Sequence, residues 1–308
     1  MSGQQPAITI HTPATSANLG PGFDTFGIAL NRHNRFHFTP SERNSLSLSS
    51  HSTVPTQALT TDNPNSNLIF QAIEAFNQHH KPAETPYFHV DIEVHIPLAR
   101  GLGSSSTAIA AGLFAANTYA GNPLTTEELV TLGTNLEGHP DNIAPALLGG
   151  ALLCDPSSNN SLYHLPWPAD WQFTLVIPEY ELLTQTARDV MPAHYTLHNA
   201  IFNVRKSSVL TYAILKQDAA ALQNALHDEL HQPYRSQLIP EFQPISELAK
   251  QAGALGTVIS GAGSTIAIIH TPDVQNTLHT TLEAFQAEHP QTTLTLQSAQ
   301  IDTRGTYA

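Results

Sequence analysis

The chain has 308 residues, of which 41% are hydrophobic and only 12% are charged. Its 12 Lys and Arg residues stand against 25 Asp and Glu residues, which gives a formal net charge of −13. A chain so poor in cations can hardly form the positive surface that nucleic-acid binding requires, so we expect no nucleic-acid partner. Its length exceeds what one hydrophobic core usually serves, which favours two domains.

No feature of the sequence indicates export or membrane insertion. Cys154 is the only cysteine, so an intramolecular disulfide is excluded, which is compatible with a reducing compartment. Residues 1–12 lack the basic segment and apolar run of a secretory signal. Residues 101–126 are uncharged, but Ser, Asn, Thr and Gly interrupt them, so they indicate a buried helix of small residues rather than a membrane span. We therefore expect a cytoplasmic protein with no membrane partner.

The first half of the chain mixes strands and helices. Apolar and polar residues alternate in several short segments, and other segments have the spacing of a helix with one apolar face. Thr125 followed by Glu128 is a capping-box pattern that marks a helix start. Strands are expected at residues 7–11, 26–30, 88–96 and, exposed, within 41–61; helices are expected at 67–79, after the turn 101–106, and at 125–136.

A segment rich in Pro, Ser and Asn, residues 155–169, predicts a domain boundary. The predicted domains are residues 1–165 and 166–308. The second half has expected strands at 173–177 and 292–301, a strand–turn–strand unit at 256–269, and helices within 200–252 and at 273–289. Neither half shows the regular alternation of a doubly wound sheet, so the fold class is α/β of the α+β type.

The strongest local motif is PLARGLGSSST, residues 97–107, between an expected strand and an expected helix. Gly101 and Gly103 allow the backbone to approach a ligand closely. The serines fall in the first helical turn, where free N–H groups and the helix dipole favour an anion. An ordinary serine-capped helix after a flexible turn would have the same local pattern. No Gly-Lys pair is present, so a Walker A loop is excluded, and Ser106 stands where the dinucleotide fingerprint needs glycine.

Histidines at helical spacing, His227 with His231 and His194 with His198, invite comparison with zinc sites. In the first pair the residue after the leading histidine is Asp228 rather than the glutamate of the zinc-protease motif. We therefore interpret these histidines as surface residues of a lysine-poor protein.

Four segments in order resemble the GHMP kinases. Residues 13–24 (PATSANLGPGFD) are similar to the first motif in its homoserine-kinase form, residues 97–107 to the second motif, and residues 259–265 (ISGAGST) to the third. Residues 137–146 (EGHPDNIAPA) are close to the homoserine-kinase pattern. Thr107 and Ser264 depart from the usual Ala and Pro, but neither change removes a glycine or an expected ligand.

The resemblance implies a two-domain GHMP kinase fold, with a ribosomal-S5-like N-terminal domain and a ferredoxin-like C-terminal domain. It also implies ATP and Mg²⁺ as cofactors, with Ser105 and Glu137 as the protein ligands of the metal. The residues expected around ATP are Pro97, Arg100, Gly101, Leu102, Gly103, Ser104, Ser105, Ser106, Gly261 and Gly263.

The acceptor end of the expected site discriminates among GHMP kinases. Arg188 and Arg235 lie in segments similar to those that supply carboxylate-binding arginines, and an arginine fork suits a carboxylate. Asp24 resembles the amine-binding acid of the family. Two arginines and one acid suit an amino acid, whereas galactose has no carboxylate and mevalonate has no ammonium. The remaining expected substrate contacts are Asn18, His139 and Asn142.

The expected reaction is ATP-dependent phosphorylation of the L-homoserine hydroxyl to O-phospho-L-homoserine, a step toward threonine. Asp24 or His139 could act as base, with Glu137 in the catalytic set, or a loose transition state could need no strong base. Another GHMP kinase, such as a mevalonate-pathway kinase, and a non-catalytic protein of this fold remain alternatives. The resemblance implies a homodimer.

Overall fold

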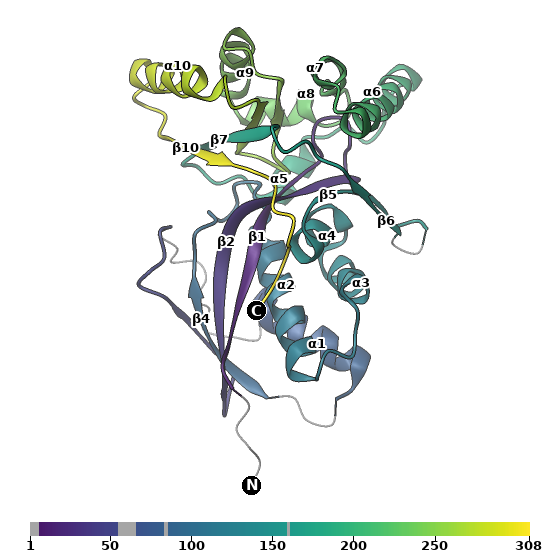
Figure 1. The fold of residues 1–308 in the computed structure, drawn as a ribbon, viewed down its shortest axis with the longest axis vertical. Helices are drawn as coiled ribbons and strands as arrows, with labels where there is room; N and C mark the ends of the chain where they lie inside the picture. Colours follow the sequence, from purple (N-terminus) through teal and green to yellow (C-terminus); the bar gives the residue numbers. More distant parts are fainter. Residues whose placement is uncertain (1–5, 55–65, 83–85, 159–160) are drawn as a thin grey trace.

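A computed structural model of the chain describes residues 6–54, 66–82, 86–158 and 161–308. These residues form two sheets, each with helices packed on it, stacked along the long axis of the molecule (Figure 1). The C-terminus returns to the half that contains the N-terminus (Figure 1). None of the helices in these described ranges combines the length and apolar character that crossing a membrane requires.

The first sheet has six strands. Its order is β3-β4-β2-β5-β6, with β1 paired to β2. The strands are β1 (Ile8–Ala17), β2 (Phe26–Ser41), β3 (Ser45–Leu48), β4 (Tyr87–Glu93), β5 (Ala151–Asp155) and β6 (Ser161–Leu165). β3 runs parallel to β4, and the other pairs are antiparallel.

Three of these strands correct the expectations from the sequence. β1 continues to Ala17 because a register shift between Pro13 and Ala14 absorbs the proline, which cannot donate to a ladder. β2 is much longer than residues 26–30, since it pairs with β1, β4 and β5 in turn. β6 forms inside the segment predicted as a break, where it pairs with β5 as a hairpin. Residues 55–61 of the predicted exposed strand lie outside the described residues.

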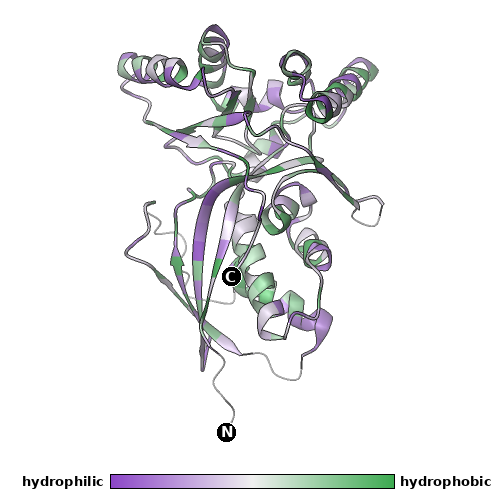
Figure 2. Ribbon diagram, in the orientation of Figure 1, coloured by the Kyte–Doolittle hydropathy of each residue, from purple (hydrophilic) through white to green (hydrophobic). Residues whose placement is uncertain are grey.

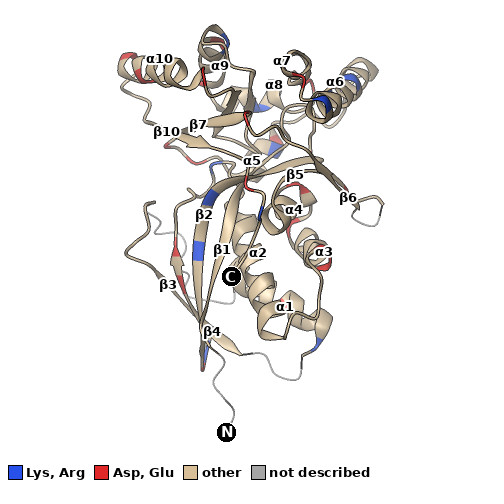
Figure 3. Ribbon diagram, viewed as in Figure 1, with Lys and Arg blue, Asp and Glu red and all other residues tan. Residues whose placement is uncertain are grey.

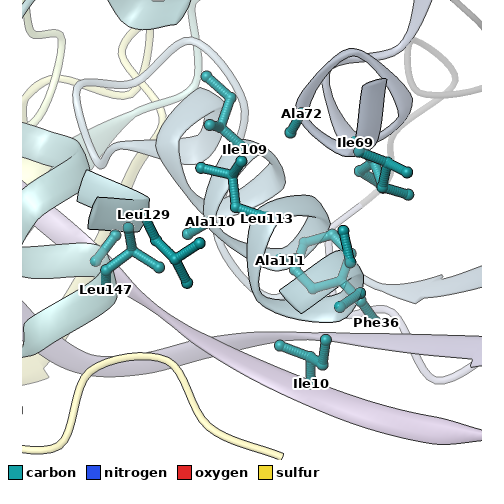
Figure 4. Close-up of a cluster of buried hydrophobic side chains, with 14 of the residues drawn as sticks. Ile10, Phe36, Ile69, Ala72, Ile109, Ala110, Ala111, Leu113, Leu129 and Leu147 are labelled. Carbon is teal, nitrogen blue, oxygen red and sulfur yellow. The ribbon is translucent and has the colours of Figure 1, made fainter. Parts of the chain in front are cut away.

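The helices α1 (Leu68–His80), α2 (Ser104–Tyr119), α3 (Thr126–Glu137) and α4 (Pro140–Leu148) pack beside this sheet (Figure 1). α2 is largely apolar (Figure 2) and is rich in small residues that let its neighbours come close. At Gly112 a Cβ would lie 2.3 Å from the Ile69 carbonyl oxygen of α1. Side chains from the sheet and from α1 to α4 fill one continuous core (Figure 4).

The second sheet is antiparallel, in the order β10-β7-β9-β8. Its strands are β7 (Gln172–Pro178), β8 (Gly256–Ile259), β9 (Ile266–His270) and β10 (Leu294–Ala299). Helices of this half pack on both faces of the sheet. α6 (Leu197–Lys216) and α7 (Ala219–Ala225) pack on one face, and α5 (Thr184–Asp189), α9 (Phe242–Gln251) and α10 (Gln275–Glu288) pack on the other. The short helix α8 (Gln232–Arg235) lies between α7 and α9 in the chain.

The two halves share a hydrophobic core. One cluster of buried residues joins Leu19 and Ile28 of the first half to Phe173 on β7 and Leu210 on α6 in the second half. The residues after β10 cross back, and Tyr307 exchanges backbone hydrogen bonds with His11. We propose to divide the chain at residues 165 and 166, with the C-terminal segment lying against the first sheet.

Candidate active site

A glycine loop opens the site at the start of α2. Gly101 and Gly103 both have positive φ angles, 72° and 66°. A Cβ at Gly101 would lie 2.1 Å from the Ser260 carbonyl oxygen, and one at Gly103 would lie 1.8 Å from the Thr15 hydroxyl. Gly103 is the N-cap of α2 and supplies no side-chain cap, so the first N–H groups of the helix can bind an anion.

Two serines of the first turn of α2 hold a carboxylate from the end of α3. The Ser105 hydroxyl donates to Glu137 Oε1 at 2.6 Å, and the Ser106 hydroxyl donates to the same carboxylate at 2.7 Å. Burial raises the pKa of Glu137, while these hydrogen bonds act in the opposite direction. The three oxygen-bearing side chains form a set that a hard cation such as Mg²⁺ prefers.

The first and third glycine loops meet at this point. Asn18 Nδ2 donates to the Gly261 carbonyl at 2.9 Å, and the Gly261 N–H donates to the Ala17 carbonyl. The Ser260 hydroxyl donates to the Gly101 carbonyl at 2.6 Å. Three segments far apart in sequence therefore frame one cavity, because each loop satisfies backbone groups of another.

Two arginines and one acid line the same cavity. The Arg188 guanidinium binds Asp24, with Nη2 2.8 Å from Oδ1 and Nη1 3.3 Å from Oδ2. Arg235 is buried and donates to the carbonyls of Ala187 and Gly261. Burial and the nearby Arg188 charge lower the pKa of Arg235 to about 10, so it stays cationic at neutral pH.

Phe23 lies against both guanidinium groups. The guanidinium carbon of Arg188 is 5.5 Å from the centre of the Phe23 ring, and that of Arg235 is 5.0 Å away. An aromatic face attracts a cation, and here one ring contacts two guanidinium groups. Phe23 stood inside a motif that the sequence identified, but nothing in the sequence distinguished its ring from a core side chain.

The start of α4 supplies the remaining polar wall. His139 Nδ1 lies 2.8 Å from Oδ1 of the buried Asp141, and this hydrogen bond is the main reason that the pKa of His139 is raised. The Thr15 hydroxyl donates to Asn142 Oδ1 at 2.7 Å. Asp141 and Thr15 line or support the site without having been predicted, although both lie in the matched segments.

The resulting cavity has a volume of about 420 Å³. Thirteen of the predicted site residues line it: Asn18, Asp24, Arg100, Gly101, Gly103, Ser104, Ser105, Glu137, His139, Asn142, Arg188, Arg235 and Gly261. Four predicted residues do not, namely Pro97, Leu102, Ser106 and Gly263. Leu102 packs in the shared core, and Ser106 is buried behind Ser105 with its hydroxyl on Glu137.

Arg100 lines the cavity, but its guanidinium is occupied elsewhere. It donates to the carbonyl oxygens of Leu98, Pro178 and Glu179. These bonds tie the glycine loop to the end of β7 in the second half. The side chain therefore holds the loop in place, and the backbone of the loop is the part that faces the cavity.

The histidine pairs are not a metal site in this fold. Among residues 6–54, 66–82, 86–158 and 161–308, no three His, Cys, Asp or Glu side chains cluster in a way that would hold a metal ion. His231 is fully buried, which corrects its interpretation as a surface residue. Its Nε2 lies 2.7 Å from the Gly20 carbonyl oxygen, and its ring stacks on Phe23, so it supports the first loop from behind.

Two family models match the chain. The model of the GHMP kinases N terminal domain matches residues 67–150, and that of the GHMP kinases C terminal region matches residues 210–285. The matched parts contain the second loop, Glu137, Arg235 and the third loop. Fold and site thus define a kinase of the GHMP class, and a kinase of this class uses ATP.

Comparison with individual proteins identifies the family within the GHMP class. The chain is 43% identical to a homoserine kinase of Thermosynechococcus vestitus over 91% of this chain and 92% of the relative, and 40% identical to one of Nostoc punctiforme over 97% of each. A solved structure of a putative homoserine kinase from Listeria monocytogenes has a TM-score of 0.78 and 28% identity, covering 98% of both chains. The homoserine kinase structure from Cytophaga hutchinsonii, at 24% identity, has the same fold, with a TM-score of 0.88 over 100% of this chain and 98% of that one. The chain belongs to the homoserine kinase family of the GHMP kinases.

Proposed function

We propose that the protein transfers the γ-phosphoryl group of ATP to the hydroxyl of L-homoserine, giving ADP and O-phospho-L-homoserine. The observation that carries this proposal is the set of Arg188, Arg235 and Asp24, which lines the same cavity as the glycine loop at the start of α2. Two cations and one acid complement the carboxylate and ammonium of an α-amino acid. The names of the relatives at about 40% identity support the same acceptor.

The charged groups of the acceptor could replace the ion pair between Arg188 and Asp24. The substrate ammonium would take the place of Arg188 beside Asp24, and the substrate carboxylate would take the place of Asp24 beside Arg188. Each of these half-buried charges would exchange one partner for another, so neither would be left unpaired in the cavity. Arg235 would add a second positive charge on the carboxylate side.

The phosphate end would work by positioning and charge neutralisation, which is what phosphoryl transfer mainly requires. The free N–H groups at the start of α2 would bind phosphate oxygens. We propose Ser105 and Glu137 as the protein ligands of Mg²⁺, since their oxygens lie 2.6 Å apart beside that helix start. A bound Mg²⁺ would neutralise charge on the β- and γ-phosphates.

We propose that no strong base removes the hydroxyl proton. Asp24 is occupied by Arg188 and is assigned to the ammonium, at the opposite end of homoserine from the hydroxyl. His139 is hydrogen-bonded to Asp141 through Nδ1. Late transfer of the proton to the phosphoryl group accords with a loose transition state. The predicted homodimer is likewise a proposal.

The test is ADP release by the purified protein with MgATP and one acceptor at a time: L-homoserine, D-homoserine, L-serine, mevalonate or galactose. We expect strong stimulation by L-homoserine alone. Stimulation by mevalonate or galactose instead would replace the acceptor and keep the kinase. Bound ATP with no turnover on any acceptor would favour a non-catalytic binding protein.

A further inference from the structure

Ser106 differs from the two serines that precede it on α2 in where its side chain lies. It is fully buried and does not line the cavity, whereas Ser104 and Ser105 do. Its hydroxyl oxygen lies 2.7 Å from Oε1 and 2.7 Å from Oε2 of Glu137. The hydroxyl is therefore bound to a carboxylate behind the cavity wall and is not open to a ligand in the cavity.

This hydrogen bond is not the one that a hydroxyl inside a helix usually makes. Ser and Thr side chains in helices commonly donate to a backbone carbonyl of the preceding turn. On α2 itself, Thr118 donates to the Phe114 carbonyl at 2.8 Å. Ser106 instead donates across to α3, whose last residue is Glu137. The bond therefore fixes a side chain of α3 and leaves the backbone of α2 as it is.

Among the described residues, Glu137 has no Lys or Arg partner to balance its charge, because the ion pairs that Arg side chains form go to other acids. α2 carries no charged residue, and α3 carries acids but no Lys or Arg (Figure 3). The serine hydroxyls supply hydrogen bonds but no positive charge. A half-buried carboxylate held in this way is suited to a cation from solution.

We propose that Ser106 is a positioning residue for Mg²⁺, whose hydroxyl fixes the Glu137 carboxylate while Glu137 and Ser105 bind the ion. This inference rests on the metal ligands of the proposed function. Ser105 is exposed at the cavity, so its hydroxyl can leave Oε1 and turn to a cation. Ser106 is buried and stays on the carboxylate. A carboxylate has about four acceptor sites, so the Ser106 hydroxyl leaves most of them open.

A fixed carboxylate should matter more to Mg²⁺ than to Ca²⁺. Mg²⁺ demands near-ideal octahedral geometry with oxygens at about 2.0–2.1 Å, whereas Ca²⁺ accepts a larger and more flexible set of ligands. Groups that hydrogen-bond to a metal ligand orient it, and their removal typically lowers metal affinity about 10–100-fold. Without the Ser106 hydroxyl the Glu137 carboxylate is free to rotate, and the ion with the stricter geometry should lose more affinity.

The test measures binding of a non-hydrolysable ATP analogue by calorimetry in EDTA, in saturating Mg²⁺ and in saturating Ca²⁺. The ratio of the Kd in EDTA to the Kd with an ion is the gain in affinity that the ion provides. Ser106→Ala is expected to leave the Kd in EDTA unchanged, to reduce the Mg²⁺ gain about tenfold, and to reduce the Ca²⁺ gain less. A merely structural link between α2 and α3 would affect both gains alike.

Two further variants separate the possible failures. Glu137→Gln removes the charge of the proposed ligand and is expected to abolish both gains. Thr118→Ala removes a different hydroxyl of α2, one that bonds within the helix, and should keep both gains at their wild-type values. Urea unfolding of each variant establishes that it is folded under the conditions of the titrations.

The outcomes distinguish the inference from the proposed function on which it rests. A Mg²⁺ gain that survived Glu137→Gln would show that the metal ligands are wrong, and the role of Ser106 would fall with them. Loss of the gain in Glu137→Gln, with the Mg²⁺ gain kept in Ser106→Ala or both gains reduced equally, would overturn the positioning role alone. None of these measurements contains homoserine, so they are independent of the acceptor assignment.

Discussion

At the scale of single residues, Phe23 contacts both guanidinium groups in the part of the cavity that we propose binds the acceptor. Its ring lies close to the guanidinium groups of both Arg188 and Arg235 and stacks on the buried His231. Two cations placed side by side would repel each other, and the aromatic face together with Asp24 offsets that repulsion. The end of the cavity that we propose binds the carboxylate is therefore held in place by the protein's own side chains, which would reduce the ordering that substrate binding requires.

Replacing Arg235 tests the carboxylate assignment. Arg235→Leu is expected to raise the KM for L-homoserine far more than the KM for ATP, because the guanidinium lies at the acceptor end. The measurement is steady-state kinetics with each substrate varied in turn. Arg235→Lys, which keeps the charge and loses the planar fork, should fall between the wild type and the leucine variant. Equal losses for both substrates would contradict the assignment.

Gly103 tests the phosphate loop. Gly103→Ala would bring a Cβ to 1.8 Å from the Thr15 hydroxyl at a φ of 66°, so the loop must move. The displacement of the loop is expected to cost about 1–3 kcal/mol of binding free energy, which is a loss of ATP affinity of roughly five- to 150-fold. The measurement is nucleotide binding by calorimetry. Gly121→Ala is the matched control, since its φ is 84° but nothing lies within 4 Å of the new methyl group. If both variants bound ATP like the wild type, the loop would not be the nucleotide site.

At the scale of elements, α3 delivers Glu137 to the site. The helix starts with a capping box in which Thr125 accepts from the Glu128 N–H and Glu128 accepts from the Thr125 N–H. It ends at Glu137, where Gly138 takes the left-handed conformation that turns the chain toward His139. The capping signal was recognised in the sequence, and the structure confirms it. The sequence did not predict that the last residue of α3 lies beside the first turn of α2, because that contact depends on how the two helices pack.

Removing the cap should weaken the fold without altering the site directly. Thr125→Ala is expected to lower the free energy of unfolding by about 1 kcal/mol, because the first turn of α3 loses a side-chain acceptor. Urea unfolding followed by circular dichroism measures the change. Thr125→Ser keeps the hydroxyl and should restore most of the loss. Equal destabilisation by both substitutions would show that the methyl group, rather than the cap, matters.

At the scale of the whole molecule, the C-terminal segment connects the two halves through hydrogen bonds to the first half. After β10, the Asp302 N–H donates to the Ala29 carbonyl and the Thr306 hydroxyl donates to the Ala146 carbonyl. Asp302 Oδ2 lies 2.9 Å from His33 Nε2, and Oδ1 accepts from the N–H groups of Arg304 and Gly305. Burial acts to raise the pKa of Asp302, but its hydrogen bonds and His33 outweigh it, and the pKa is lowered from 3.8.

This lowered pKa predicts how stability depends on pH. A carboxyl whose pKa is lower in the folded state contributes stability above its unfolded pKa, and that contribution is lost as pH falls through the folded pKa. Asp302→Asn should therefore lower stability at pH 6 and reduce the further loss of stability on acidification toward pH 3. Urea midpoints across this range are the measurement. Asp170→Asn, at an exposed residue before β7, is the control and should follow the wild type. A wild-type acid response unchanged by Asp302→Asn would contradict the assignment.

Local patterns in the sequence determined much of this protein. The three glycine loops, the capping box of α3, most helices and the small-residue character of α2 follow from turn chemistry and periodicity, which depend on near neighbours in the chain. The lengths of β1 and β2 did not, because a strand continues for as long as partners pair with it, and those partners lie far along the chain. β6 was not predicted for the same reason: its segment is rich in turn-forming residues, and it becomes a strand because it pairs with β5.

The candidate site was likewise predicted only in part from the sequence. The family resemblance singled out positions 24, 188 and 235, and the charges of those side chains then indicated an amino-acid acceptor, since charge and hydrogen-bonding capacity belong to the side chain itself. Only the tertiary structure decided that Asp24 pairs with Arg188 and that the guanidinium of Arg100 binds backbone carbonyls. It also decided that the Phe23 ring contacts both Arg188 and Arg235. These outcomes depend on which segments meet when the two halves pack on a shared core, and contacts between residues so distant in sequence leave no local pattern to be recognised.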